Sequence, residues 1–459
     1  MKLLNYQSKL ILIFALLASP FIVQAQNQTS PEDLPKPYQF VKSYVKDNNY
    51  ITPILDLKAR EEKYLASKMR MSYLEWIIQL ENSVGSYDEA YRYEDVLYGE
   101  FPSRKNEIKQ YKKDIADVKS SPVADYKMID AVAAIDSIAG KNQVIMINEE
   151  HRTPFHRALT TQLLAKLYAK GFRYFAAETI NEEDAELNKR GYPVQKTGTY
   201  TLDPVYADTI RTALKLGYKI VPYETRDTTC KSPEDNPEFC TDKRERDQAQ
   251  NLYDRILKDD SQAKIFVHVG RGHNSKAELS KEFNFMAYYF QKITGIEPFT
   301  IDQLRFSQRY DRAMEQPLFR LLTKENLLQK PSVYQSANGK FYNLGLGYDM
   351  VIFHPRLSYK NGRATFLEMN GLRKAEKINL KRLKLAARKQ VFTGKEPVLI
   401  QAFFAEESAD AVPVDQIIIY PNQEIPVLML PAGNFRIKAT DSAGKVTAED
   451  YLLRVKGKK

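Results

Sequence analysis

Side chains that can move protons near neutral pH are concentrated in the middle of this sequence. Imidazole groups ionise close to pH 7, and they act as general bases, general acids or metal ligands in many sites. The sequence contains five histidines, which are His151, His156, His268, His273 and His354. We therefore expect any reaction or ligand binding to involve this part of the chain.

Glutamates accompany these histidines. Glu149 and Glu150 stand directly before His151, and Glu178 and Glu224 follow later apolar runs. A carboxylate that contacts an imidazole ring fixes its orientation and stabilises its protonated form. Either Glu149 or Glu150 can do this for His151, and the other is then expected to be a solvated loop carboxylate.

Standard nucleophile and zinc motifs are absent from the sequence. There is no G-x-S-x-G elbow and no H-E-x-x-H or H-x-x-E-H motif in the chain. The only cysteines, Cys230 and Cys240, are expected to form a disulfide in an exported chain, with two free thiols as the alternative. The His and Glu side chains would then activate water directly or through a metal ion.

Short apolar runs that alternate with helical patterns must position these groups. Runs of this kind lie at 144–147, 172–177, 218–223, 264–269 and 350–353. Helical patterns separate them, as in a mostly parallel sheet with flanking helices. The sequence therefore predicts an α/β fold.

The carboxyl ends of the strands in such a sheet form a ligand-binding crevice. Glu149 and His151 follow the first run, Glu178 follows the second, and His273 follows the fourth. We expect these four side chains to converge at one edge of the sheet and to form the catalytic centre. Glu224, which follows the third run, is expected to contact the substrate.

The other histidines have structural alternatives. His268 alternates with Phe266 inside a strand, which is typical of a packed core residue. His354, before Pro355, can satisfy backbone groups. His156 lies in the first turn of a helix, where the helix dipole disfavours its charged form. It is expected to contact the substrate or to serve as a helix cap.

Two arginines open the helix that follows the cysteines. Arg244 and Arg246 are both placed where a guanidinium could reach the strand ends. We favour Arg246, in the run Arg246-Asp247-Gln248-Ala249, as the catalytic arginine. An ion pair on the helix surface is the alternative for this side chain.

The beginning of the sequence resembles an export signal. Lys2 and Lys9 supply positive charge, residues 10–17 are apolar, and small residues precede a cleavage site after Ala25. Residues 1–25 are therefore predicted to be a signal peptide. The protein is then expected to be secreted or periplasmic, with no transmembrane segment after signal removal.

The remaining sequence divides into three predicted regions. Residues 26–130 are charged and helical, and residues 131–389 form the α/β domain. Residues 390–459 contain short strand-like runs separated by turns, as in a small antiparallel β-sandwich. The net charge of +10 is spread widely, and no nucleic-acid-binding module is evident. Nothing in the sequence indicates the oligomeric state.

Taken in order, these motifs resemble the erythromycin-esterase-like superfamily, which includes ChaN-type haem-binding lipoproteins and Tiki/TraB-type metalloproteases. Its members share a G-E-x-H or G-E-x-x-H segment after the first strand, a strand-ending Glu and a later G-x-x-H. The resemblance covers about residues 140–355. It rests on Asn148-Glu149-Glu150-His151, His156, Glu178, Arg246-Asp247 and Gly270-Arg271-Gly272-His273.

The resemblance implies a role for each matching residue. His151 would be the general base, beside Glu149 of the same motif. Glu178 would hold or polarise the attacking water, and His273 would contact the water or an oxyanion. Arg246 would match the arginine that opens the helix before the later strand.

This sequence departs from the family pattern at two points. Asn148 stands where the family usually has Gly, and Asn also tolerates an unusual backbone conformation. One residue separates Glu149 from His151, which suits the ChaN and Tiki branches better than the macrolide esterases. A macrolide lactone is therefore not the expected substrate.

Three functions are compatible with these residues. The first is an exported hydrolase that activates water against an ester, lactone or amide of a small molecule or peptide, without a cofactor. The second is a haem- or divalent-metal-binding protein, with His151, Glu178 and His273 as ligands of a metal. The third is a non-catalytic interaction protein that uses its C-terminal β-domain.

Overall fold

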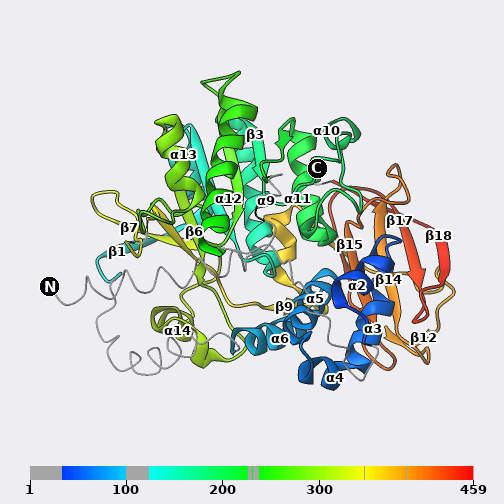
Figure 1. Ribbon diagram of the computed structural model, residues 1–459. Helices are drawn as coiled ribbons and strands as arrows, with labels where there is room; N and C mark the ends of the chain where they lie inside the picture. The colour runs from blue at the N-terminus through cyan, green and yellow to red at the C-terminus, as the bar shows by residue number, and fades with distance from the viewer. Residues whose placement is uncertain are drawn as a thin grey trace.

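The computed structural model describes residues 34–99, 123–225, 230, 237–345, 347–388 and 390–457. The predicted signal peptide and its cleavage site lie outside these residues. Helices come first in the described chain, a large sheet flanked by helices follows, and small antiparallel sheets come last (Figure 1). None of the helices in this described part is both long and apolar enough to cross a membrane.

An eight-stranded sheet with the order β1-β7-β8-β6-β2-β5-β3-β4 confirms the α/β fold predicted from the sequence. Its strands are β1 (Tyr126–Asp130), β2 (Val144–Glu149), β3 (Phe172–Ala177), β4 (Lys219–Val221), β5 (Lys264–Gly270), β6 (Phe299–Phe306), β7 (Ser332–Ser336) and β8 (Met350–Phe353). The strands from β8 to β4 run parallel to one another, and β7 and β1 complete one edge with antiparallel pairings.

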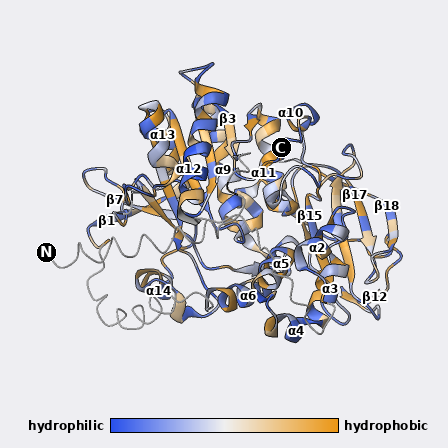
Figure 2. Cartoon of the chain, in the orientation of Figure 1, coloured by the Kyte–Doolittle hydropathy of each residue, from blue (hydrophilic) through white to orange (hydrophobic). Residues whose placement is uncertain are grey.

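Helices cover both faces of this sheet, so its central strands are buried on both sides. Ile145 and Ile147 of β2 face one hydrophobic cluster, whereas Val144 and Met146 face another. The first layer contains α8 (Ala131–Ala139), α9 (Pro154–Ala169) and α11 (Pro204–Leu216), and the second contains α12 (Pro237–Leu252), its π-helical continuation η2 (Tyr253–Leu257) and α13 (Met286–Thr294). In Figure 2 the central strands are largely hydrophobic, whereas the helices carry both colours.

Two elements of this domain differ from the sequence prediction. Strand β6 pairs with β2 in the middle of the sheet but was not predicted, because Asp302 and Gln303 interrupt its apolar pattern. The helix after the fourth apolar run is expected from about Lys276, but it begins only at Met286. Before it, Asn284 and Ser280 form side-chain hydrogen bonds with nearby backbone groups, which compete with helix formation.

The helices that precede the sheet share a core with the end of the chain. They are α2 (Pro37–Val45), α3 (Ile51–Ala59), α4 (Glu61–Ala66), α5 (Arg70–Ser83) and α6 (Tyr87–Gly99). Their buried apolar side chains form one cluster with Leu399 and Ile418 of the C-terminal sheet. Figure 1 shows these blue helices beside the orange and red strands.

A four-stranded antiparallel sheet with the order β15-β14-β17-β18 forms the C-terminal region. Its strands are β14 (Val398–Phe404), β15 (Asp415–Ile419), β17 (Gly433–Thr440) and β18 (Val446–Val455). Leu399 of β14 faces the N-terminal helices, and Ile400 faces a second cluster that includes Leu428 and Leu430 of β16 (Leu428–Leu430). The small antiparallel region is thus as predicted, but helices cover one of its faces.

Two strands lie across the predicted region boundaries. Strand β1 falls in the region expected to be helical, yet it pairs with β7 of the large sheet. Strand β11 (Lys374–Glu376) falls in the expected α/β domain, yet it pairs with β16. The remaining short elements are α10 (Leu187–Arg190), η1 (Tyr200–Leu202), η3 (Arg312–Met314), α14 (Pro317–Lys324), β9 (Tyr359–Lys360), β10 (Arg363–Ala364), η4 (Thr365–Gly371), β12 (Ala387–Arg388) and β13 (Val391–Phe392).

Buried ion pairs join α11 to the C-terminal part of the chain. Arg373 donates two hydrogen bonds to Asp208 at 2.9 and 2.7 Å. Arg211 of α11 donates two to Glu407 at 2.7 and 2.6 Å. Removing one partner of such a pair leaves an uncompensated charge in a place that water reaches poorly.

Replacing Arg373 with alanine should therefore destabilise the protein by about 3–5 kcal/mol. The matched control is Arg436→Ala, because Arg436 pairs with the more exposed Glu449 and such pairs contribute less than about 1 kcal/mol. Urea unfolding followed by circular dichroism measures both free energies of unfolding. Equal losses in the two variants would contradict the prediction.

Candidate functional site

Parallel strand register brings the predicted residues together at one edge of the sheet. Glu149 is paired with Gly270 across β2 and β5, and Glu178 directly follows β3. His151 Nδ1 lies 2.8 Å from Glu149 Oε1, and His151 Nε2 lies 3.9 Å from Glu178 Oε1. His273 Nε2 lies 3.6 Å from the same Glu178 oxygen. The four side chains predicted to form the centre are therefore neighbours.

The backbone of Gly270 supports the His151 ring. A Cβ atom at Gly270 would lie 2.4 Å from His151 Cε1 and Nε2 and 2.8 Å from Glu178 Oε2, so no larger residue fits without displacement. The amide of Gly270 also donates a hydrogen bond to Glu178 Oε2. Gly270 belongs to a motif of the sequence, but its role could not be predicted, because this close approach depends on the sheet register.

Glu149 is a buried carboxylate that holds several donors. Arg157 donates to it at 2.6 and 2.7 Å, and His268 Nε2 lies 2.8 Å from its Oε2. Burial alone would raise the pKa of Glu149, but Arg157 and then His268 lower it well below its usual value. Because an ionised carboxylate can only accept hydrogen bonds, we assign the proton of neutral His151 to Nδ1. Nε2 is then the basic nitrogen of the ring.

Arg157 is a member of the site that the sequence analysis missed. It lies on the buried side of α9 and is 2% exposed. Besides Glu149, it donates to Asp203 Oδ2 at 2.6 Å and to the carbonyl of His151 at 2.7 Å. Asp203 caps the amino end of α11 by accepting from the amide of Val205. The sequence feature that could have identified Arg157 is its charge within the apolar pattern of α9.

His268 is a core residue that also contacts the site. It was expected to be packed in the core, and it is buried among aromatic rings. Its Nδ1 lies 3.2 Å from Thr160 Oγ1, and its Nε2 faces Glu149. The residue therefore helps to orient the carboxylate on which His151 depends.

The structure places Arg244, and not Arg246, in the site. Arg244 Nη2 donates to Glu178 Oε1 at 2.9 Å and to Glu224 Oε2 at 2.6 Å. The Arg246 side chain is 59% exposed and pairs with Asp242 on the outside of α12. Residues two apart on a helix point to nearly opposite sides, so only one of these arginines can face the sheet. The structure thus gives Arg244 the position that was expected of Arg246, and Glu224 lies in the site as the partner of Arg244.

His273 is held by a second buried carboxylate. Its Nδ1 lies 2.7 Å from Glu245 Oε2, which also accepts from the amide of Met286. Burial would lower the pKa of His273, but Glu245 and Glu178 raise it overall. Burial would raise the pKa of Glu178, but His273, His151 and Arg244 lower it to about 2. Each of these two groups therefore favours the charged form of the other.

His156 and His354 lie apart from these residues. His156 Nδ1 accepts a hydrogen bond from the amide of Glu150 at 3.1 Å, and its ring is 5.1 Å from that of His354. His354 Nε2 lies 3.1 Å from Gln303 Oε1. Burial lowers the pKa of His156 to about 3, which keeps the ring neutral. The local hydrogen bond matches the capping alternative, and the substrate contact expected for His156 remains a prediction.

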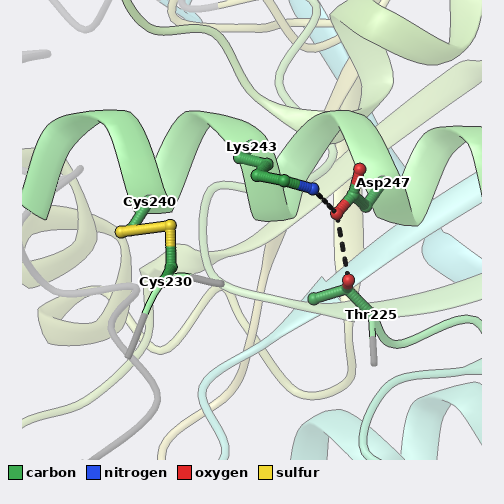
Figure 3. Close-up of a disulfide and its surroundings, with 5 residues drawn as sticks. All are labelled: Thr225, Cys230, Cys240, Lys243 and Asp247. Carbon is green, nitrogen blue, oxygen red and sulfur yellow. Dashed lines mark hydrogen bonds and ion pairs between the residues drawn. A yellow bond between two sulfur atoms is a disulfide. The ribbon is translucent and has the colours of Figure 1, made fainter. Parts of the chain in front are cut away.

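The predicted disulfide between Cys230 and Cys240 is present. It fastens the chain that follows β4 to the beginning of α12, the helix that carries Arg244 (Figure 3). Further along this helix, Asp247 accepts hydrogen bonds from Thr225 at 3.0 Å and from Lys243 at 2.7 Å. These contacts hold α12 against the end of β4. Most residues between β4 and α12 lie outside the described part.

The histidine and glutamate side chains at the strand ends are poorly arranged to bind a metal ion. Among the residues described here, no group of three or more His, Cys, Asp or Glu side chains is arranged to hold one. The guanidinium of Arg244 lies against Glu178, with its Nη1 3.3 Å from His273 Nε2. A second cation at this point would be repelled. Within the set His151, Glu178 and His273, suggested as metal ligands, the carboxylate of Glu178 is therefore already paired with Arg244.

The fold and the site define an α/β protein with a His/Glu/Arg cluster at the carboxyl ends of its strands. No family model and no curated protein matches the chain. Among solved structures, the type III effector HopBA1 is similar over 51% of this chain and 99% of that chain, with 15% sequence identity and a TM-score of 0.33. A likeness of this size carries no argument about function.

A Gly270→Ala variant tests the contact between β5 and the site. The added methyl group would overlap His151 and Glu178, so we expect a loss of about 1–3 kcal/mol in the free energy of unfolding. Gly140→Ala is the control, because an added Cβ there has no atom within 4 Å. Urea unfolding measures both variants. If the two variants had the same free energy of unfolding, the assigned contact between Gly270 and His151 would be contradicted.

His156 should make stability depend on pH. Its pKa is about 6.5 in an unfolded chain and about 3 in the native protein. As the pH falls below 6.5, the unfolded state binds this proton first, so native stability decreases until the pH approaches 3. Between pH 5.5 and 4.5, the wild type should lose about 1.3 kcal/mol more than His156→Asn. If urea unfolding gave parallel pH profiles of stability for the wild type and His156→Asn, this prediction would be contradicted.

Proposed function

We propose that this protein is an exported hydrolase in which His151 activates water against an ester, lactone or amide. The observation that carries the proposal is the position of the His151 ring between two carboxylates. Glu149 binds Nδ1 at 2.8 Å, and Glu178 lies 3.9 Å from Nε2. A buried carboxylate on one ring nitrogen leaves the other as an oriented base, as general-base catalysis requires.

The space between His151 and Glu178 suits a water molecule. A separation of 3.9 Å is too long for a direct hydrogen bond, and a bridging water would be within reach of both groups. His151 Nε2 would take a proton as the water oxygen attacks the carbonyl carbon. The protonated ring would then give that proton to the leaving oxygen or nitrogen, so that an acid and an alcohol or amine are released.

Neighbouring groups support the charges that form during this reaction. Glu149 stabilises the His151 imidazolium that follows proton transfer. The oxyanion of the intermediate would be stabilised by Arg244, whose side chain is 11% exposed beside Glu178. The ring of Tyr200 stacks on His151 at 4.0 Å with an interplanar angle of 18°, which restricts rotation of the base.

Chromogenic esters provide a direct test. The full-length protein is expected to hydrolyse 4-nitrophenyl butyrate, and His151→Ala should reduce kcat/KM by at least about 100-fold, because general-base catalysis contributes that much. Arg246→Ala is the control, since its side chain is mostly exposed on α12. Activity should persist after dialysis against a chelator. Undiminished turnover by a folded His151→Ala protein would refute the proposal.

The same proteins distinguish the haem-binding alternative. Of the five histidines, His151 has the most exposed ring, with a side chain that is 13% exposed. Haem titration should give no Soret shift that depends on His151 if the protein is a hydrolase. A shift lost in His151→Ala, together with no ester turnover, would favour haem binding instead.

A further inference from the structure

Basic side chains reach solvent at the strand ends, whereas their carboxylate partners lie beneath them. These basic side chains, 11 to 17% exposed, are Arg152, Arg244, Arg271 and the imidazole of His151. The carboxylates, 5% exposed or less, are Glu149, Glu150 and Glu178. Glu224 is 28% exposed, but both its oxygens accept hydrogen bonds from Arg244. The accessible part of the site is therefore mainly cationic.

Arg152 and Arg271 share one carboxylate beside the proposed base. Glu150 lies 3.0 Å from Arg152 Nη2 and 3.1 and 3.2 Å from Arg271 Nε and Nη2. Glu75 Oε1 is 3.9 Å from Arg152 Nη1, which is beyond hydrogen-bond distance. Burial raises the pKa of Glu75 to about 7, although both arginines act to lower it. One carboxylate, that of Glu150, is thus within hydrogen-bond distance of both guanidinium groups.

The backbone of Arg271 is held in an unusual conformation. Its φ of 36° lies in the left-handed region, which residues with a side chain rarely adopt. Its amide donates to the carbonyl of Glu149 at 2.8 Å, and its carbonyl accepts from Asn148 Nδ2 at 2.7 Å. Strain that neighbouring groups maintain in this way is concentrated at binding sites. Arg271 directly follows Gly270, on which the His151 ring lies.

We infer that Arg152 and Arg271 bind an anionic group, a carboxylate or a phosphate, on the substrate that His151 attacks. This inference rests on the proposed hydrolase function and specifies its substrate class. The planar guanidinium fork of arginine matches the paired oxygens of both groups. Arg152 adjoins His151 in the chain, and Arg271 adjoins it through Gly270. An anion held there would place a nearby ester or amide carbonyl at the base.

Two esters with the same leaving group measure this preference. They are mono-4-nitrophenyl glutarate, which carries a free carboxylate, and its neutral methyl ester. We expect the wild-type kcat/KM to be about 10- to 100-fold higher for the anionic ester, as charge-assisted hydrogen bonds imply. The ratio should fall toward one in Arg152→Gln and Arg271→Gln, mainly through KM, and should persist in Arg246→Gln. A wild-type ratio near one would overturn the inference.

Glu150→Gln provides a variant with the opposite expected effect. It removes the carboxylate that competes for the two arginines, so the KM for the anionic ester should fall by about 10-fold. Thermal unfolding establishes that each variant is folded at the assay temperature. An unchanged or higher KM in folded Glu150→Gln would contradict the assigned role of the arginine pair.

Anion binding can also be measured without turnover. Inorganic phosphate and succinate, added separately, should each be tested for a rise in the Tm of the wild type that is absent in Arg152→Gln and Arg271→Gln. The anion with the larger effect identifies the preferred group. Such binding without hydrolysis of either ester would refute the proposed function alone. Equal hydrolysis of both esters without a Tm shift would refute this inference alone, and the absence of both responses would refute both.

Discussion

A single buried negative charge organises the centre of this protein. Glu149 ends the central strand β2 and is 2% exposed, and an unpaired carboxylate in such a place costs several kcal/mol. Arg157 from α9 and His268 from β5 compensate it, and Arg157 also reaches Asp203 at the start of α11. The charge therefore determines how two strands and two helices meet. The orientation of His151 follows from the same contacts, so stability and the proposed chemistry share their residues.

Much of the fold could be predicted because its strands are continuous apolar runs. The run at Met350–Phe353 coincides with β8, which is buried and apolar throughout, and the run at Phe172–Ala177 coincides with β3, in which only Arg173 is charged. The proximity of Glu149 and Glu178 followed from topology, because the ends of parallel strands share one edge. Strand β6 could not be predicted because polar residues interrupt its apolar pattern. Its Gln303 donates to the carbonyl of Asn148, a contact that gives a polar residue a place in the core.

Features that depend on packing rather than on pattern could not be predicted. Arg244 and Arg246 differ only in helical phase, and α12 is so rich in charge that its buried face has no apolar pattern to reveal. Arg157 was a visible anomaly in an apolar helix, but its partner became evident only when β2 and α9 were placed together. The same holds for Arg271, whose backbone conformation is set by contacts with Asn148 and Glu149. Sequence spacing was enough to predict where the site lies. Which arginines contribute to it depends on three-dimensional packing.

The shared core of the N-terminal helices and the C-terminal sheet has a consequence for the order of folding. Leu399 and Ile418 complete a cluster that otherwise consists largely of side chains from α2 to α6. During synthesis, those helices emerge with an apolar surface that has no partner until almost the whole chain has been made. Contacts between such distant parts of a sequence slow folding and prolong the exposure of aggregation-prone surface. A chain that ends before β15 would therefore leave its first region with an incomplete core.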